Sequence, residues 1–134
     1  MKLPILYILT FLVFLGIDAI WLFIISKNLY SNNIGHLMAE NPKLLPALIF
    51  YLAFVVGVIV FAILPGYTEK SLLKTVLLAT LFGALTYATY DLTNLATLKD
   101  WPVQITIIDI AWGTSVATMT GIAGYYIATW LGVE

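Results

Sequence analysis

The chain has 134 residues, 62% of them hydrophobic and 10% charged, and its formal net charge at pH 7 is −1. Soluble domains carry about 25% charged residues, and a chain this short would need many polar residues to cover its surface. The composition therefore excludes a soluble globular enzyme, a disordered tail and, because no basic patch is present, a nucleic-acid-binding protein, and it predicts an integral membrane protein.

Four segments meet the length requirement of a membrane-spanning helix, which is about 20 predominantly apolar residues. They cover residues 3–25, 44–64, 72–98 and 102–131. An open sheet would leave backbone groups unpaired in lipid, and the segments are too uniformly apolar for a membrane barrel. We therefore expect an all-α fold, a four-transmembrane-helix bundle formed by residues 1–134 as one transmembrane domain in the lipid bilayer.

Turn-forming residues separate these segments. The loop from Asn28 to Lys43 between the first two helices contains a few apolar residues, and either a short interfacial helix or a plain loop fits it. Pro65 and Gly66 are predicted to end the second helix, because Pro cannot continue the hydrogen-bond ladder. Pro102 suits the first turn of the fourth helix.

The even number of spans places both termini on one side of the membrane. Lysines divide equally between the two sides, but the free amino terminus and the closeness of Lys70 to Lys74 favour cytoplasmic termini. The first segment continues past Asp18 without a small-residue cleavage site, so we expect it to be retained and not removed as a signal peptide. Aromatic residues near the predicted helix ends are assigned to an aromatic belt at the membrane surfaces: Tyr30, Tyr51, Tyr67, Trp101 and Trp130.

Three aspartates lie inside the predicted spans: Asp18, Asp91 and Asp109. Asp18 and Asp91 each precede the end of their helix by about two turns, and Asp109 follows the start of its helix by about two turns. Because the fourth helix runs back through the membrane, all three fall at a similar depth, beneath the loop that carries His36. Charged residues within membrane helices usually face an interior or a cavity. We therefore predict an acidic cluster at one end of the bundle.

Two of these aspartates share a local pattern in which Trp follows Asp by three residues. The pairs are Asp18 with Trp21 and Asp109 with Trp112, each on one helix face. The indole N–H can donate a hydrogen bond into a pocket while the ring forms its wall. Two such motifs on oppositely oriented helices suit an inverted repeat, and a coincidence among the four Trp residues is the alternative.

The third helix carries the densest polar stripe, with Tyr87, Asp91 and Asn94 in one row and Tyr90 beside it. Its carboxylate and amide oxygens suit a hard cation such as Mg²⁺ or Ca²⁺, with Asp91 as the central ligand and the other two aspartates as further metal ligands. Without Arg in the chain, three neighbouring carboxylates cannot all be charged unless a cation joins them. Two alternatives to a metal ion would also neutralise the cluster: the carboxyl groups are protonated, or a loop lysine reaches them from the rim of the bundle.

The predicted ligand-binding or ion-binding residues are therefore the aspartates, their polar and aromatic neighbours and the loop histidine: Asp18, Asp91, Asp109, Asn94, Tyr87, Tyr90, Trp21, Trp112 and His36. The threonines of the third and fourth helices are expected to serve only as hydrogen-bonding groups between helices. Gly113, Ala117 and Gly121 are small residues at four-residue spacing, which lets two helices approach closely, either within one copy of the chain or between copies.

Several kinds of chemistry are excluded by what the sequence lacks. There is no Cys, so disulfides, thiolate metal sites and iron–sulfur clusters are impossible, and the single His cannot supply a haem-ligating pair. No nucleotide-binding loop, serine nucleophile elbow or zinc-protease motif is present.

The stretch Tyr87–Leu98, with its Tyr-Asp-Leu-Thr-Asn-Leu-Ala-Thr string, resembles a bacterial family of small predicted membrane proteins classified as a domain of unknown function. Further matching pieces lie along the whole chain: the stretch Asp18–Leu22, Tyr30, Gly35-His36-Leu37, Phe50-Tyr51, Trp101-Pro102 and the stretch Asp109–Gly113. The resemblance covers almost the whole chain. It implies four membrane helices and a bacterial origin, and it transfers no activity. We therefore expect the protein in the bacterial cytoplasmic (inner) membrane.

Three functions fit these observations. The leading hypothesis is cation or proton binding and transport at the acidic cluster, by a homo-oligomer, because four helices enclose only a narrow interior. The second is a membrane-embedded lipid-modifying enzyme or its partner, since paired carboxylates can perform acid–base or metal-assisted chemistry. The third is a structural subunit of a larger membrane complex, which would suit a chain with so little mass outside the bilayer.

Overall fold

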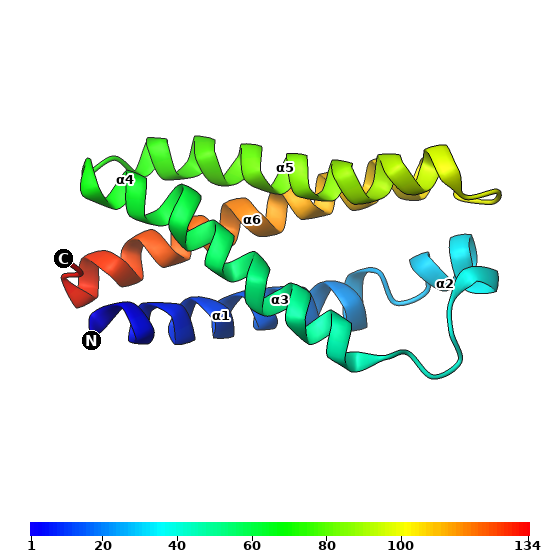
Figure 1. Ribbon diagram of the computed structural model, residues 1–134, viewed down its shortest axis with the longest axis horizontal. Coiled ribbons are helices and arrows are strands. Elements are labelled where there is room, and N and C mark those ends of the chain that lie inside the picture. The colour runs from blue at the N-terminus through cyan, green and yellow to red at the C-terminus, as the bar shows by residue number, and fades with distance from the viewer.

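The computed structural model describes all of residues 1–134 and contains helices but no strand. Four helical stretches are long and apolar enough to cross a membrane: Lys2–Ile25, Leu44–Thr68, Leu72–Thr97 and Val103–Leu131. They form an elongated bundle with both termini at one end (Figure 1). The predicted all-α, four-helix membrane fold is confirmed, and the shared position of the termini agrees with an even number of spans.

The first span consists of α1 (Lys2–Ile20) and a π-helical turn, η1 (Trp21–Ile25). Its buried residues recur every four positions along one face: Leu6, Thr10, Phe14 and Asp18. The helix ends at Ser26, whose backbone N–H and hydroxyl both donate to the carbonyl oxygen of Trp21, at 2.7 and 2.8 Å. The π turn, a feature often found at functional sites, thus lies directly after the turn that carries the buried aspartate.

A short helix follows, which decides between the two alternatives for this segment. It comprises α2 (Leu29–Ile34) and a 3₁₀ turn, η2 (Gly35–Leu37). Ile34 packs with Trp101 and Ile105 at the start of the fourth span. The connection therefore folds back over one end of the bundle, and Trp101, which the sequence assigned to an aromatic belt, is buried in that contact.

The second span continues through Pro65, where the sequence predicted its end. It consists of α3 (Leu44–Val58), a π turn η3 (Ile59–Ile63) and α4 (Leu64–Thr68). Pro lacks an N–H, and its ring crowds the carbonyl four residues earlier, so an uninterrupted α-helix would be strained there. The wider π turn before Pro65 accommodates the ring, and the helix continues for another turn. The prediction of a helix end at this point is therefore wrong.

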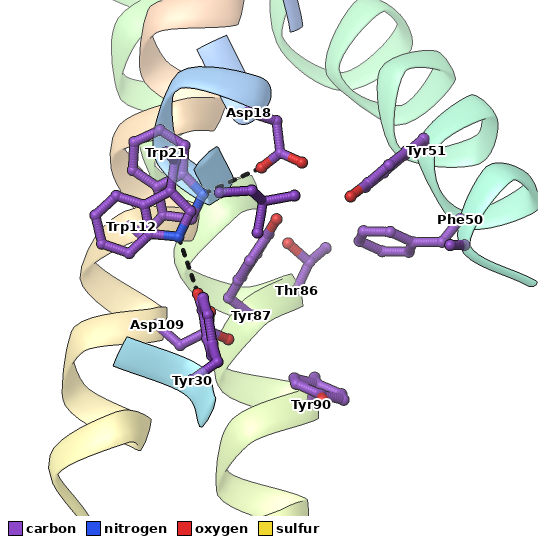
Figure 2. Close-up of a pocket in the computed structure, with 12 residues that line it drawn as sticks. Asp18, Trp21, Tyr30, Phe50, Tyr51, Thr86, Tyr87, Tyr90, Asp109 and Trp112 are labelled. Atoms are coloured by element: carbon purple, nitrogen blue, oxygen red, sulfur yellow. Dashed lines mark hydrogen bonds between the residues drawn. The ribbon is translucent and has the colours of Figure 1, made fainter. Parts of the chain in front are cut away.

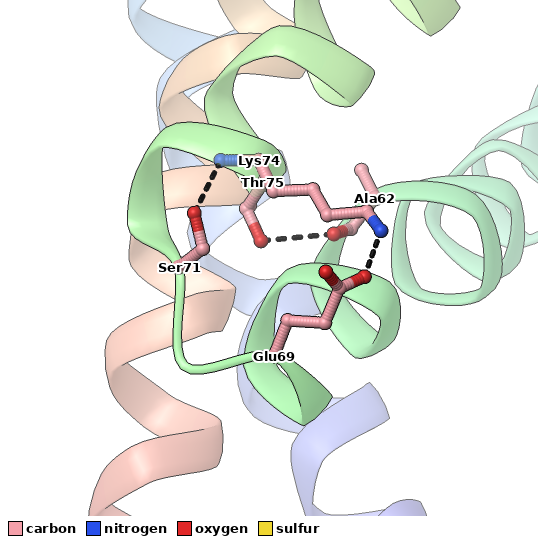
Figure 3. A network of polar contacts seen from close by, with 5 residues as sticks. All are labelled: Ala62, Glu69, Ser71, Lys74 and Thr75. Atoms are coloured by element: carbon pink, nitrogen blue, oxygen red, sulfur yellow. Dashed lines mark hydrogen bonds and ion pairs between the residues drawn. The ribbon is translucent and has the colours of Figure 1, made fainter.

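Thr75 of the third span supports this irregular junction (Figure 3). Its hydroxyl donates to the carbonyl oxygen of Ala62 at 2.9 Å, in the interior of the bundle. Gly66 permits this approach, because a Cβ atom at that position would collide with the Thr75 side chain. A side chain from a neighbouring helix thus supplies a donor to a backbone carbonyl where the regular helical pattern is interrupted.

The turn before the third span is fixed by its own polar contacts (Figure 3). The hydroxyl of Ser71 accepts a hydrogen bond from the backbone N–H of Lys74 at 3.1 Å and so caps the helix that follows. The Lys74 ammonium group also pairs with the Glu69 carboxylate on the other side of the turn.

The third and fourth spans are the uninterrupted helices α5 (Leu72–Thr97) and α6 (Val103–Leu131), which lie side by side along the bundle (Figure 1). Small residues let them approach closely: a Cβ atom on Gly83 would collide with Ala117 and with the backbone carbonyl of Gly113. The small-residue row of α6 therefore packs within one copy of the chain, which decides the alternative that the sequence left open.

The hydrophobic core occupies the middle of the bundle and the half nearest the termini. Its largest fully buried members include Leu6, Phe14, Val55, Ile63 and Val116. At the opposite end α3 diverges from the bundle (Figure 1), and residues 44–50 are all exposed. The four spans thus pack tightly at one end and leave room between them at the other.

Candidate functional site

A pocket of about 320 Å³ lies between the diverging α3 and the other three spans, at the end of the bundle that α2 covers (Figure 2). All four spans and α2 contribute to its wall. The lining residues are Asp18, Trp21, Leu22, Tyr30, Ala47, Phe50, Tyr51, Thr86, Tyr87, Tyr90, Asp109 and Trp112. Seven of these twelve side chains are aromatic and two are acidic, so the pocket is an aromatic chamber with two carboxyl groups.

The two tryptophans of the repeated Asp-x-x-Trp pattern meet at one side of this pocket. The indoles of Trp21 and Trp112 stack with their ring centroids 4.4 Å apart and their planes 5° from parallel. Trp21 belongs to the π turn of the first span and Trp112 to α6, so the stack joins these two spans (Figure 2). The two Asp-x-x-Trp motifs therefore lie next to each other in the structure.

Each aspartate of the two patterns is held by the tryptophan of the other. The Nε1–H of Trp112 donates to Asp18 Oδ1 at 3.4 Å. The Nε1–H of Trp21 donates to the hydroxyl oxygen of Tyr30 at 3.0 Å, and that hydroxyl donates in turn to Asp109 Oδ1 at 2.7 Å. The arrangement is reciprocal, with a direct bond in one half and a tyrosine between the partners in the other.

The two carboxyl groups of the pocket have only neutral partners. Asp18 and Asp109 are 6% and 7% exposed. No Lys, Arg or His lines the pocket. The two ion pairs of the chain, His36 with Asp100 and Lys74 with Glu69, involve neither carboxyl group. Buried charges in proteins are normally paired with an opposite charge. These two carboxyl groups therefore lack the partner that a negative charge at this position requires.

Tyr30 is suited to be a permanent donor in this network. Burial, and after it the neighbouring Asp109 carboxylate, raise the pKa of the Tyr30 hydroxyl well above its ordinary value. The phenol therefore keeps its proton over the whole physiological pH range. The sequence placed Tyr30 in an aromatic belt at the membrane surface, but α2 turns the side chain inward, onto the carboxylate.

Asp91 does not line the pocket. The residue is fully buried, and neither of its carboxyl oxygens has a hydrogen-bond partner. The carboxyl group of Asp109 on α6 lies close enough to interact with it electrostatically. The three predicted aspartates thus share one end of the bundle, with two in the pocket and the third buried beside one of them.

This geometry does not agree with a metal ion held by Asp91, Asp109 and Asp18 together. No group of three or more His, Asp or Glu side chains is arranged to hold a metal ion. The sequence argument for a Mg²⁺ or Ca²⁺ site matched the depths of the three residues in the membrane. Depth fixes the height of a side chain along the bundle but not its direction around the helix axis, and Asp91 is turned toward the contact between α5 and α6.

Two other predicted site residues also lie outside the pocket. Asn94 follows Asp91 by one turn of α5 and does not contribute to the lining. His36 lies in the connection after α2, where its Nε2 atom is 3.6 Å from a carboxylate oxygen of Asp100. Both partners of that pair are more than half exposed. His36 therefore lies near the connection between α5 and α6 and not at the carboxyl groups of the pocket.

The second span contributes to the pocket, although none of its residues was among the predicted site residues. Phe50 and Tyr51 of α3 form the pocket wall opposite the two tryptophans (Figure 2), and Thr86 lies on α5 beside them. The site was predicted from charged residues within the spans, and the second span has none. Tyr51 was assigned to the aromatic belt. The signal that could have found it is a tyrosine placed about two turns inside an otherwise apolar helix.

Comparison with known proteins agrees with the membrane fold. No curated protein and no solved structure matches the chain. A family model described as a predicted membrane protein, DUF2177, matches residues 3–126, which is nearly the whole chain and agrees with the resemblance that its motifs indicated. The chain is thus a member of the DUF2177 family of predicted membrane proteins.

Proposed function

We propose that this protein binds a cation in the aromatic pocket and acts in cation or proton transport. The observation that carries the proposal is the pair of buried carboxyl groups, Asp18 and Asp109, which face a pocket without any positively charged side chain. A negative charge buried without a positive partner is costly, so a cation that enters the pocket would supply what the chain itself does not.

The hydrogen bonds around the two carboxyl groups support this role. Trp112 and Tyr30 each donate to one oxygen of a carboxyl group, which fixes the direction of the group without neutralising it. Neutral donors of this kind hold a carboxylate ready for a ligand, because the side chain needs no rearrangement when the cation arrives. The stacking of Trp21 on Trp112 fixes the position of both donors, because Trp112 is one of them and Trp21 holds the hydroxyl of Tyr30, which is the other.

A proton is the smallest cation, and the carboxyl group of Asp91, which is buried outside the pocket, can carry one. A charged carboxylate with no partner is unfavourable in a fully buried position, so we infer that Asp91 carries a proton there. Its neighbour Asp109 lines the pocket, so a cation bound there would lie near the buried carboxyl group of Asp91. Cation binding in the pocket and the proton on Asp91 would therefore influence each other.

Transport would require a path beyond the pocket, and we propose that more than one copy of the chain supplies it. The half of the bundle nearest the termini is filled by core residues such as Leu6, Phe14 and Ile63. A homo-oligomer, or a rearrangement of α3 against the other spans, would open a second exit. We place this assembly in a bacterial inner membrane with cytoplasmic termini, as the sequence analysis expected.

The proposal is tested by reconstituting the protein in liposomes and measuring uptake of protons and of radiolabelled cations under an imposed gradient. Asp18→Asn and Asp109→Asn should each reduce the flux by about tenfold or more, because a neutral amide cannot balance a positive charge. Asp100→Asn, in an exposed loop, is the matched control and should leave the flux unchanged. Absence of any flux and of any cation binding to the wild-type protein would overturn the proposal.

A second candidate, a lipid-modifying enzyme or its partner, is favoured by one observation. Part of the pocket rim is formed by Phe50 and Leu22, which are 44% and 38% exposed on the outer surface, where lipid tails would contact them. A lipid could therefore reach the carboxyl groups from the side. Mass spectrometry of intact lipids from deletion and overexpression strains tests this candidate, and an unchanged lipid profile would reject it.

A further inference from the structure

The composition of the pocket wall narrows the class of cation that it would take. Trp21, Trp112, Tyr87 and Phe50 belong to four different elements, and together with the remaining tyrosines they surround the two carboxyl groups (Figure 2). The faces of aromatic rings attract cations, and a weakly hydrated cation such as a quaternary ammonium ion loses little hydration when it leaves water for such a site. Sites that recognise ammonium ions combine such rings with few polar atoms.

We propose that the pocket binds an organic cation with an ammonium group and an apolar body. This inference rests on the proposed cation-binding function and names its substrate class. The aromatic faces would contact the body and the alkyl groups of the ammonium head, while Asp18 and Asp109 would balance its charge.

The geometry disfavours an inorganic metal ion as the ligand. Hard divalent cations take six or more oxygen ligands, and the chain offers no group of three carboxylate or histidine side chains. One oxygen of Asp18 and one of Asp109 already accept hydrogen bonds. An organic ammonium ion, by contrast, needs charge balance and surface contact and no complete oxygen shell.

The size of the pocket also suits a small organic molecule. Its volume of about 320 Å³ lies at the lower end of the range of small-molecule pockets, which is roughly 300–1,000 Å³. This space is far larger than a bare ion occupies. It is also too small for the acyl chains of a complete phospholipid to enter along with the headgroup.

Charge selects among organic ligands as well. The pocket has two acidic and no basic side chains, so a phosphate or carboxylate on the ligand would find no positive partner. A zwitterionic headgroup such as phosphocholine carries the right ammonium group but also a phosphate. We therefore expect the ligand to be a cation without an anionic group. The exposed rim residues Phe50 and Tyr90 let such an amphipathic ion enter from the lipid side.

The test is isothermal titration of the purified protein in dodecyl maltoside with benzyltrimethylammonium. Neopentylbenzene, which has the same shape without the charge, is one comparison, phosphocholine is the second, and KCl and MgCl₂ form the third. Benzyltrimethylammonium should bind at least about tenfold more tightly than each of the others. Equal binding of neopentylbenzene would overturn the inference, because charge would then play no part. Equal binding of phosphocholine would overturn the exclusion of zwitterionic headgroups.

Two variants separate the contributions of the rings and the carboxyl groups. Phe50→Leu keeps an apolar side chain but removes an aromatic face, and it should weaken benzyltrimethylammonium binding by about three- to tenfold. Phe61→Leu, an exposed aromatic residue of the same span outside the pocket, is the control and should have no effect. Equal affinities for Phe50→Leu and wild type would contradict the aromatic contribution.

The failure of this inference is distinguishable from the failure of the proposed function. If inorganic cations or protons bind in a manner that Asp18→Asn abolishes, while benzyltrimethylammonium does not bind, the substrate class is wrong and the cation-binding function stands. If no cation of any kind binds to the folded protein, both proposals fail. Folding of each variant is checked by helical circular dichroism and by gel filtration in the same detergent.

Discussion

At the scale of single residues, Tyr30 decides how half of the pocket is held. Its hydroxyl accepts from Trp21 and donates to Asp109, so one oxygen atom joins α2 to two membrane spans. A group that bridges a donor and an acceptor leaves both unsatisfied when it is removed, and that loss costs more than the hydrogen bonds themselves contribute. The residue therefore matters both for stability and for the direction of the Asp109 carboxylate.

We predict that Tyr30→Phe lowers the free energy of unfolding by about 1–3 kcal/mol, because Trp21 and Asp109 lose their partner inside the bundle. The measurement is an unfolding titration with sodium dodecyl sulfate in mixed micelles, followed by circular dichroism. Tyr126→Phe is the matched control, since the same hydroxyl is removed from a side chain that is 56% exposed. Equal unfolding midpoints for Tyr30→Phe and wild type would show that the hydrogen bonds of Tyr30 do not stabilise the protein.

A second residue-scale prediction concerns Gly113, which packs against the ring of Tyr87. A Cβ atom on Gly113 would overlap the Tyr87 ring near its attachment point, where the side chain has little freedom to move. Gly113→Ala should therefore destabilise the protein by about 1–3 kcal/mol and displace Tyr87 from the pocket wall. Gly16→Ala is the control, because nothing lies within 4 Å of the added atom. Equal free energies of unfolding for Gly113→Ala and Gly16→Ala would show that α5 and α6 do not approach each other closely at Gly113.

At the scale of elements, two of the four spans contain a π turn, and each turn has a local cause. The turn Ile59–Ile63 accommodates Pro65, and the turn Trp21–Ile25 ends the first span where Ser26 bonds back to the Trp21 carbonyl. Both irregularities are supported by side chains that donate to backbone carbonyls. Irregular helix geometry in lipid needs such donors, because no water is present to replace them.

We predict that Thr75→Val lowers the free energy of unfolding by about 0.5–1.5 kcal/mol, because the carbonyl of Ala62 loses its donor while the shape of the side chain is preserved. Thr89→Val is the matched control, since the Thr89 hydroxyl bonds only within its own helix and the residue is exposed. The measurement is the midpoint of thermal unfolding in detergent. A midpoint for Thr75→Val equal to that of Thr89→Val would show that the junction needs no support.

The sequence predicted the elements better than their ends and their rotation. Long apolar runs determine four spans because lipid admits only such helices, and this prediction is confirmed. The end at Pro65 was wrong because a π turn in the preceding residues absorbs the ring, and no local pattern announces such a turn. Asp91 was expected to be central, but its direction depends on the close packing of α5 on α6, which the three-dimensional arrangement of small residues sets.

At the scale of the whole molecule, the bundle has a packed end and an open end. The termini lie at the first, and α2 and the connection between α5 and α6 lie at the second (Figure 1). The hydrophobic core reaches from the middle of the bundle to the first end, and the pocket lies at the second. All of the proposed chemistry is thus confined to one side of the membrane. The same asymmetry makes the orientation of the protein decisive for the direction in which any ligand would enter.

Because the chain contains no Cys, single cysteines can report its orientation without a background signal. We predict that Asn32→Cys at the open end is labelled by a membrane-impermeant maleimide in intact cells, whereas Lys70→Cys at the packed end is labelled only after the cells are broken. Labelling of both in intact cells would contradict four spans. The opposite pattern would reverse the proposed orientation and leave the fold unchanged.

The parallel indoles of Trp21 and Trp112 have a spectroscopic consequence. At a centroid separation of 4.4 Å their excited states interact, so the pair should produce a signature in near-ultraviolet and far-ultraviolet optical spectra that isolated indoles do not give. Any guest molecule, or any motion of the first helix relative to the last, that slides one ring off the other would weaken this signature. The spectral signature of the two stacked indoles therefore reports changes in the pocket without an added dye or label.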